Sequence, residues 1–314
     1  MEYLLLVFLW PLLLLSVPIS ASPYLQKRLT VVESSCAGTR FAQVKDANSI
    51  AQEIGKIAES YMNKFIGHLE GKGGLSQLEV ETIEQGLKEL YKITNYQSPQ
   101  TKEIVKRIKT TCGQIAKIQP ADIRIFCDRR GWLAKVDDKG QSYKGDALEA
   151  GKQMWWDSIF HTWTPMKNAF CAGVHAFNTH TANTRSPDEP RDIITFCPDM
   201  WRVTKGQSTP REIALNAPGS VEYKLSTLKD SVAGALFHEF THTEQGGKTI
   251  DVKWTDPQGK KWYAVKYDIL KKLNTHQALE NAETYATMAM GLYLLHHGFK
   301  VSWSEDRVWR AAGC

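Results

Sequence analysis

Apolar side chains recur every three or four positions through residues 46–118, the spacing of one buried face of an α-helix. A first stripe ends before the glycine pair at 73–74, a second follows that pair, and a third runs from Gln100 to Ile118. Ser76 and Glu79 have the spacing of a capping box at the start of the second stripe. The pattern predicts three helices, whose buried faces carry Ile50, Ile54, Ile57, Tyr61 and Phe65, then Val80, Ile83, Leu87 and Leu90, then Ile104, Ile108, Cys112 and Ile115.

After Pro120 the pattern changes to the two-residue period of a strand. Apolar and polar residues alternate over 123–127, and two further short runs, at 132–136 and 192–197, are also typical of strands. These runs are short and separated by turn residues, so they predict a small sheet, which we expect to be antiparallel.

Helical patterns return in the last third of the chain. An apolar run starts at Ser231, with Ser226 or Thr227 as its candidate N-cap, and a long helix is expected to begin near His276. Together with the first three helices, these elements predict an α+β fold that is mainly helical.

The N-terminus has the pattern of a secretory signal peptide, because a nearly unbroken apolar run at 4–15 leads into small residues. We expect residues 1–21 to be removed and the mature protein to be secreted, with no membrane association after cleavage. The basic pair Lys27-Arg28 is a candidate site for removal of a short pro-segment ending at residue 28. All six cysteines follow the signal, and an even number in an oxidising compartment predicts three disulfides.

The net charge and the domain organisation narrow the prediction only slightly further. The chain has 39 Lys and Arg against 34 Asp and Glu, a net charge of +5 that is spread without any run of five or six like charges, which argues against a nucleic-acid partner. No long polar linker separates two units, so residues 22–120 are expected to form a helical region that packs on residues 121–314. We expect a monomer.

Residues 238–242 read His-Glu-Phe-Thr-His, the HExxH pattern. On a helix, side chains four positions apart lie one above the other, so His238 and His242 can bind one Zn²⁺ ion together. Glu239 is then placed to take a proton from a metal-bound water, the general-base role in zinc peptidases. The sequence therefore predicts one zinc ion and a hydrolytic reaction.

A catalytic zinc site needs a third protein ligand. The downstream candidates are Asp251, His276, Glu280 and Glu283, and the residues alone leave this choice open. No histidine lies six residues after His242, which excludes the extended metzincin pattern.

Two segments resemble the secreted fungal deuterolysins and the related lysine-specific metalloendopeptidases, the aspzincin group. Residues 243–251, Thr-Glu-Gln-Gly-Gly-Lys-Thr-Ile-Asp, resemble the family's Gly-Thr-x-Asp turn, and residues 281–286, Asn-Ala-Glu-Thr-Tyr-Ala, resemble its Asn-Ala-Asp-x-Tyr-Ala helix. More loosely, the cysteine-bearing runs at 125–127 and 196–198 also match. The resemblance implies a zincin-like catalytic region over 121–314, with His238, His242 and Asp251 as zinc ligands and Glu239 as the base.

The chain departs from the family in two places. A Tyr-Gly pair closely follows the family's aspartate and is thought to supply an oxyanion donor, whereas this chain inserts residues 254–261 there and leaves Tyr263 and Tyr267 as candidates. Lysine-specific members carry two acids on the final helix, and the corresponding positions here are Glu283 and Ala286, so strict lysine specificity is not expected. Glu283 is also a candidate acceptor for the second N–H of a ligating histidine.

These features predict a secreted zinc metalloendopeptidase acting on extracellular proteins or peptides. The alternative is a secreted zinc-binding or zinc-scavenging protein of the same fold, for which a carboxylate at Glu239 would be unnecessary. A third reading is a helical interaction module with a closed structural metal site, for which His276 would be the fourth ligand.

Overall fold

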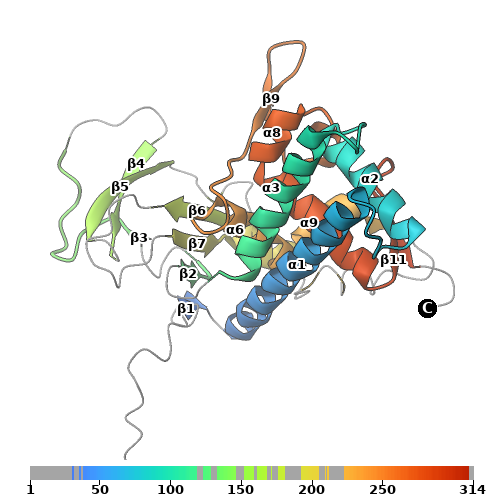
Figure 1. The fold of residues 1–314 in the computed structure, drawn as a ribbon. Coiled ribbons are helices and arrows are strands. Elements are labelled where there is room, and N and C mark those ends of the chain that lie inside the picture. The colour runs from blue at the N-terminus through green and yellow to red at the C-terminus, as the bar shows by residue number, and fades with distance from the viewer. Residues whose placement is uncertain are drawn as a thin grey trace, which may run out of the picture.

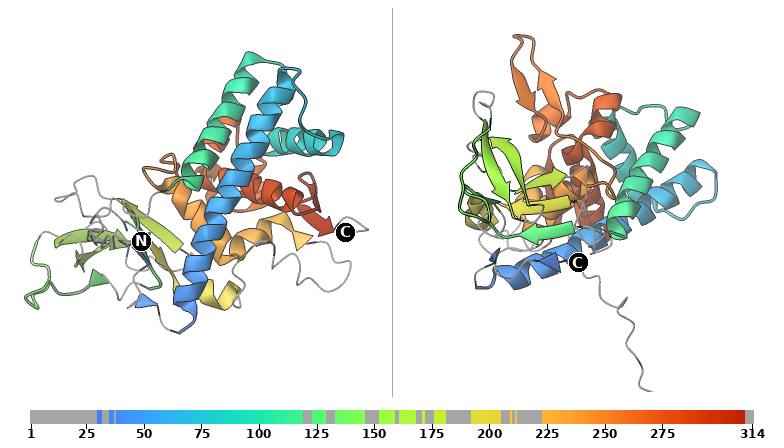
Figure 2. Two further views of the ribbon diagram at one scale, coloured as in Figure 1. Left: turned by 60° about the horizontal axis from the view of Figure 1, so that its bottom comes forward. Right: turned by 90° about the vertical axis from the view of Figure 1, so that its left-hand side faces the viewer.

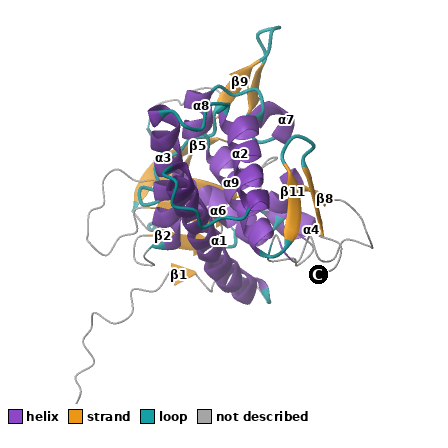
Figure 3. Cartoon of the chain, turned by 45° about the vertical axis from the view of Figure 1, so that its right-hand side comes forward, coloured by secondary structure: helices purple, strands orange, loops and turns teal. Residues whose placement is uncertain are grey.

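The computed structural model describes residues 30–31, 35–36, 38–118, 123–128, 133–145, 152–158, 161–167, 171, 176–180, 192–204, 209, 211 and 223–310. The expected signal peptide and pro-segment lie outside these residues. Helices form the centre of the molecule and short strands lie around them (Figure 1, Figure 3), so the predicted α+β class is confirmed.

The three helices expected in the first third are present as α1 (Arg40–Leu69), α2 (Gln77–Tyr91) and α3 (Pro99–Ala116). The capping box of α2 is complete: Ser76 accepts a hydrogen bond from the Glu79 amide, and the Glu79 carboxylate accepts one from the Ser76 amide. Helix α3 begins with Ser98 as N-cap and proline at its first position, which suits the fixed φ of proline. Local signals thus define both helix starts.

The helix that bears the HExxH run is α6 (Val232–His242). Its N-cap is Ser231, whose hydroxyl accepts from the Gly234 amide at 2.9 Å. The prediction of Ser226 or Thr227 as N-cap is wrong, because residues Leu225–Asp230 form a separate 3₁₀ helix, η4, before the α-helix begins.

The long helix expected from near His276 is two helices, α8 (Thr275–Glu280) and α9 (Ala282–His296). The break falls at Asn281, which has extended backbone angles and forms an isolated parallel β-bridge with Ile250. Two shorter helices are α4 (Pro198–Thr204) and α7 (Tyr267–Leu270).

The four-stranded sheet has the order β1-β2-β7-β6 and is mixed. Its strands are β1 (Thr30–Val31), β2 (Ile123–Phe126), β7 (Asp192–Phe196) and β6 (Ala176–His180). The pairs β1–β2 and β2–β7 are parallel, and only β6 runs antiparallel to its neighbour. The expected antiparallel arrangement therefore does not describe this sheet.

The other described sheets are small and antiparallel, as expected. One comprises β3 (Leu133–Ala134), β4 (Lys152–Asp157) and β5 (Thr162–Lys167), and lies to one side of the helices (Figure 2). A second is the hairpin of β9 (Lys253–Thr255) and β10 (Lys261–Tyr263). The third has the order β11-β12-β8 and contains β11 (Phe299–Ser302), β12 (Arg307–Arg310) and β8 (Tyr223–Lys224).

Helix α1 packs against α3, α6 and α9, so the N-terminal helices share one hydrophobic core with the HExxH helix. The approach to α3 is close at Gly55, where an added Cβ would lie 2.7 Å from the carbonyl oxygen of Cys112. Among the described helices, none is both long and apolar enough to cross a bilayer.

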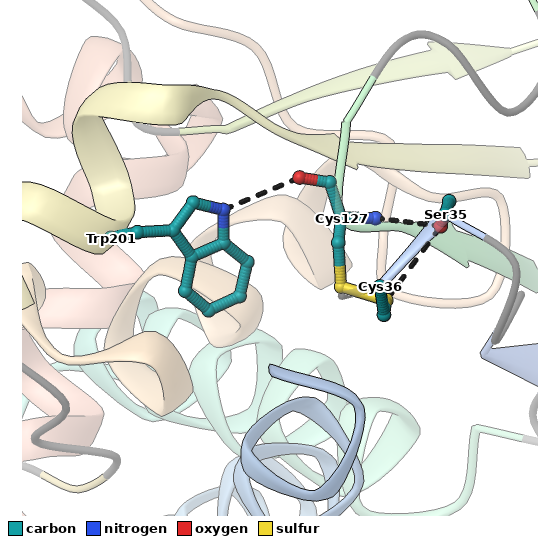
Figure 4. Close-up of a disulfide and its surroundings, with 4 residues drawn as sticks. All are labelled: Ser35, Cys36, Cys127 and Trp201. Atoms are coloured by element: carbon teal, nitrogen blue, oxygen red, sulfur yellow. Dashed lines mark hydrogen bonds between the residues drawn. A yellow bond between two sulfur atoms is a disulfide. The ribbon is translucent and has the colours of Figure 1, made fainter. Parts of the chain in front are cut away.

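Two disulfides are present, Cys36–Cys127 and Cys171–Cys197. Around the first, Ser35 accepts a hydrogen bond from the Cys127 amide at 3.0 Å, and the Trp201 indole donates to the Cys127 carbonyl at 3.3 Å (Figure 4). The expectation of three disulfides is wrong at Cys112, a fully buried free thiol whose pKa is raised to about 12 by burial. Cys314 lies outside the described residues.

Candidate metal centre

The last two turns of α6 carry both histidines of the HExxH run. Residues 232–237, the first part of the helix, are buried in the core all round, while His238 and His242 remain partly accessible. Their Nε2 atoms lie 3.2 Å apart, and their rings meet edge to face with centroids 4.9 Å apart. The helix therefore points both imidazoles at one position, as the four-residue spacing predicted.

Asp251 completes a triangle with these two nitrogens. Its Oδ1 lies 3.3 Å from Nε2 of His238 and 3.6 Å from Nε2 of His242. A tetrahedral zinc ion with bonds of about 2.0–2.1 Å holds its ligand atoms about 3.3–3.4 Å apart. Among the described residues these three form the one cluster of His, Cys, Asp and Glu side chains suited to a metal, and its size fits Zn²⁺.

The Nδ1 atoms of both histidines have hydrogen-bond acceptors. Oε2 of Glu283 lies 3.0 Å from Nδ1 of His238, and the carbonyl oxygen of Thr249 lies 2.8 Å from Nδ1 of His242. These partners assign the ring proton to Nδ1 and leave the Nε2 lone pair facing Asp251, the arrangement usual for metal-ligating histidines. The site thus gathers electron pairs at one point, which favours a cation there.

The charges around the two histidines also favour a cation at this position. Without a bound cation, burial lowers the pKa of His238, but hydrogen bonds to Asp251 and Glu283 outweigh burial and hold the pKa well above its ordinary value. The pKa of His242 is lowered, first by burial and then by the nearby charge of His238. The two carboxylates therefore attract one positive charge to the cluster, which a metal ion can replace.

A tight turn brings Asp251 back over α6. The hydroxyl of Thr243 donates to the Phe240 carbonyl at 2.7 Å, and the Thr249 amide donates to the Thr241 carbonyl at 3.0 Å. At Gly246 the chain passes so close to α6 that an added Cβ would lie 1.7 Å from the carbonyl oxygen of Phe240. Glycine is required there because of this approach.

The break between α8 and α9 fixes the segment that contains Asp251. The Ile250 amide donates to the Glu280 carbonyl at 2.8 Å, and the Ala282 amide donates to the Ile250 carbonyl at 3.0 Å. The side chain of Asn281 is fully buried, accepts from the Val252 amide at 3.0 Å and donates to the Ala264 carbonyl at 3.1 Å. The sequence gives Asn281 no role beyond its place in the segment 281–286, because its partners Val252 and Ala264 are distant along the chain.

The other candidate ligands have different partners. His276 and Glu280 lie 3.6 Å apart at Nε2 and Oε1, are largely or partly exposed, and are not in the cluster. Glu283 meets His238 at Nδ1, which is the outer nitrogen, so its expected role as a hydrogen-bond acceptor is the one that the geometry supports. Among the candidates, Asp251 alone is brought to the two Nε2 atoms.

Glu239 follows the first ligand on α6, and its side chain is buried, with 5% exposure. It is near enough to His238 for its charge to raise the pKa of that imidazole. The position of Glu239 beside His238 is compatible with the predicted role of general base, which stays a prediction.

The two candidate tyrosines differ sharply. Tyr267 is buried, and its hydroxyl donates to the Trp303 carbonyl, so its single donor hydrogen is already used inside the core. The prediction of Tyr267 as an oxyanion donor therefore has no support in the geometry. Tyr263 is 44% exposed on β10 and pairs across the hairpin with Lys253, which follows Asp251 by two residues.

The chain matches no protein-family model and no curated protein.

Proposed function

We propose that this protein is a secreted zinc metalloendopeptidase. The observation that carries the proposal is the triangle formed by Nε2 of His238, Nε2 of His242 and Oδ1 of Asp251, with Glu239 next to the first ligand. Two imidazoles and one carboxylate are a ligand set for catalytic zinc, because three protein ligands leave a coordination position for water or substrate.

The residues around the triangle have separate tasks in this proposal. Zinc bound there would polarise the scissile carbonyl and lower the pKa of a water. Glu239 would be the general base, taking a proton from the attacking water and returning it to the leaving amine. Tyr263 is the candidate donor to the oxyanion, and Glu283 and the Thr249 carbonyl hold the two imidazoles in the ligating tautomer.

Secretion belongs to the same proposal. It rests on the apolar N-terminal run at 4–15, and the disulfides Cys36–Cys127 and Cys171–Cys197 are consistent with an oxidising compartment. Its substrates would then be extracellular proteins or peptides.

The test combines metal analysis with turnover. The purified full chain should contain one zinc per molecule, cleave unfolded casein, lose cleavage with a chelator and regain it with added zinc. Glu239→Gln should keep the zinc and lose cleavage by at least about 10²-fold, since general-base contributions have this size. Glu280→Gln removes a nearby carboxylate that faces His276 and should cleave normally.

Two results would overturn the proposal. Casein cleavage by Glu239→Gln at the wild-type rate would show that Glu239 is not the base. Stoichiometric zinc in a wild-type protein that cuts no member of a broad peptide library would instead favour the zinc-scavenging protein.

A further inference from the structure

The hairpin of β9 and β10 begins two residues after Asp251 and projects from the helical core (Figure 1, Figure 3). In register, Lys253 pairs with Tyr263, Trp254 with Trp262, and Thr255 with Lys261. Within the described residues β9 pairs with β10 alone, so its second edge has unpaired backbone groups that an extended peptide can use.

Exposure alternates along the chain that leads into the hairpin. Asp251, Lys253 and Thr255 are exposed, whereas Val252 is buried and Trp254 is half-buried. Alternate residues of an extended chain point to the same side, so Lys253 lies on the side of the metal ligand Asp251. The spacing between them is about 7 Å, the length of two residues in a strand.

Cross-strand pairing adds two residues of β10 to that side, Lys261 and Tyr263. The ammonium of Lys253 lies 4.7 Å from the centre of the Tyr263 ring, which confirms that the two side chains share a face. We call Lys253, Lys261 and Tyr263 the basic face of the hairpin. A lysine over a ring keeps N–H donors available for a carboxylate.

The hairpin has an excess of positive charge. Residues 253–263 contain three lysines and one aspartate. The aspartate, Asp256, is engaged in the turn: it accepts from the Lys260 amide at 2.8 Å and from the Trp262 indole at 2.9 Å. Its carboxylate thus bonds to Trp262, whose side chain alternates with those of Lys261 and Tyr263 and therefore points to the other face of the hairpin.

We infer that the basic face selects peptide substrates with an aspartate or glutamate close to the scissile bond. This inference rests on the proposed peptidase function. A substrate bound at the metal centre and extended along β9 places side chains two to four residues from the scissile bond beside Lys253 and Lys261, since each residue of an extended peptide spans about 3.3 Å. Carboxylates at these positions complement the ammonium groups.

The position of the basic face favours a peptide over the two other anionic partners that lysines and aromatic rings can serve. The tip of the hairpin, residues 256–259, reads Asp-Pro-Gln-Gly, which offers no aromatic or large aliphatic side chain for insertion into a membrane. A nucleic acid would need a longer basic track, whereas these residues are adjacent to the metal ligand and within the length of a short peptide.

Binding is tested in a full-length Glu239→Gln background, so that peptides stay intact. Two fluorescent eight-residue peptides, one with two aspartates and one with asparagines in their place, are titrated by anisotropy. The aspartate peptide should bind about tenfold tighter, and the difference should shrink at high salt. The double variant K253E/K261E should lose the preference and instead favour a matching peptide with lysines.

The matched control is K139E/K300E, which changes the net charge equally at two exposed lysines away from the hairpin. It should keep the preference for the aspartate peptide. The reversed preference of K253E/K261E for a lysine peptide cannot come from a failure to fold. Equal binding of the aspartate and asparagine peptides would overturn the inference, as would tighter hairpin-dependent binding of single-stranded DNA or anionic vesicles.

A peptide-library digest with wild-type protein separates this inference from the proposed function. Cleavage with acidic residues enriched within four positions of the cut supports both. Cleavage without that enrichment overturns the inference and leaves the peptidase in place. If nothing is cut, the peptidase proposal fails, and retention of the aspartate preference in the binding assay still supports an acidic-peptide site on the hairpin.

Discussion

The carboxamide oxygen of Asn281, the residue at the break between α8 and α9, accepts a hydrogen bond from the backbone amide of Val252, 3.0 Å away. The same side chain donates to the Ala264 carbonyl, so one buried amide holds both ends of the segment that carries the hairpin. Asp251, which precedes Val252, is therefore positioned from a helix break thirty residues further along the chain.

Replacement of Asn281 by alanine should weaken zinc binding by about 10–100-fold, because residues that orient ligands have effects of this size. It also leaves a buried amide and carbonyl without their partner, at a cost of about 1–3 kcal/mol in unfolding free energy. Competition with a chromophoric chelator measures the first effect. Asn274→Ala, which removes an exposed N-cap of α8, is the control: stability should fall by about 1 kcal/mol with zinc affinity unchanged.

Glu283 should act on the metal through His238. Alanine at this position removes the acceptor of the Nδ1 proton and should reduce zinc affinity by about tenfold or more, whereas glutamine can still accept that hydrogen bond and should have a smaller effect. Competition with a chelator ranks the zinc affinities of Glu283→Ala, Glu283→Gln and the control Glu280→Gln. Equal affinity of all three variants and wild type would contradict the assigned role.

Replacement by alanine should change the stability of the protein in opposite directions at Gly246 and at Gly67. At Gly246 the new Cβ would collide with the Phe240 backbone, so Gly246→Ala should lose more than about 3 kcal/mol of stability or fail to fold. Gly67 lies inside α1, where the nearest atom to an added Cβ is 3.8 Å away, so Gly67→Ala should stabilise by about 0.5–1 kcal/mol. Urea denaturation measures both.

The capping box of α2 should make the unfolding free energy of the protein decrease at low pH, through the carboxylate of Glu79. Burial raises the pKa of Glu79, but hydrogen bonds from Ser76 and Tyr61 outweigh it and leave the pKa below its ordinary value. A lowered pKa in the folded state stabilises above the unfolded pKa of about 4.3, and this contribution disappears as pH falls through the folded value. Wild type should therefore lose more stability than Glu79→Gln between pH 6 and pH 3, roughly the range that brackets that titration.

If the difference in unfolding free energy between wild type and Glu79→Gln stays constant over this pH range, the charge of Glu79 does not contribute to stability. Tyr61→Phe is the companion variant, since it removes the hydrogen bond of 3.1 Å from α1 and should bring the pKa of Glu79 closer to its ordinary value.

Elements with local signals were predictable from sequence, and elements defined by distant partners were not. The three N-terminal helices have their own apolar stripes, and α2 has its own capping box, so nothing beyond neighbouring residues was needed. The break at Asn281 depends on Ile250, and the parallel pairing of β2 with β7 joins segments almost seventy residues apart. Local patterns contain no information on such pairings.

In the candidate metal centre, too, the features with local signals were predictable and those that depend on distant contacts were not. The spacing of His238 and His242 on one helix predicted their convergence. The residues alone left four downstream candidates for a third ligand, and only the resemblance indicated Asp251, because the turn at Gly246 that brings Asp251 to the histidines depends on its close approach to α6. The different environments of Tyr263 and Tyr267 were also beyond local patterns, because the hydroxyl of Tyr267 meets Trp303 only in the folded core.

Helix α1 has a consequence for the maturation of the protein. Because α1 packs against both α6 and α9, a processing step that discarded the N-terminal helices would uncover apolar surface of the helices around the candidate metal centre. A nick between α3 and β2 would leave two polypeptides joined through Cys36 and Cys127, which migrate together until the disulfide is reduced. Helix α1 is therefore part of the same packed unit as the candidate metal centre, and its removal would expose apolar surface of α6 and α9.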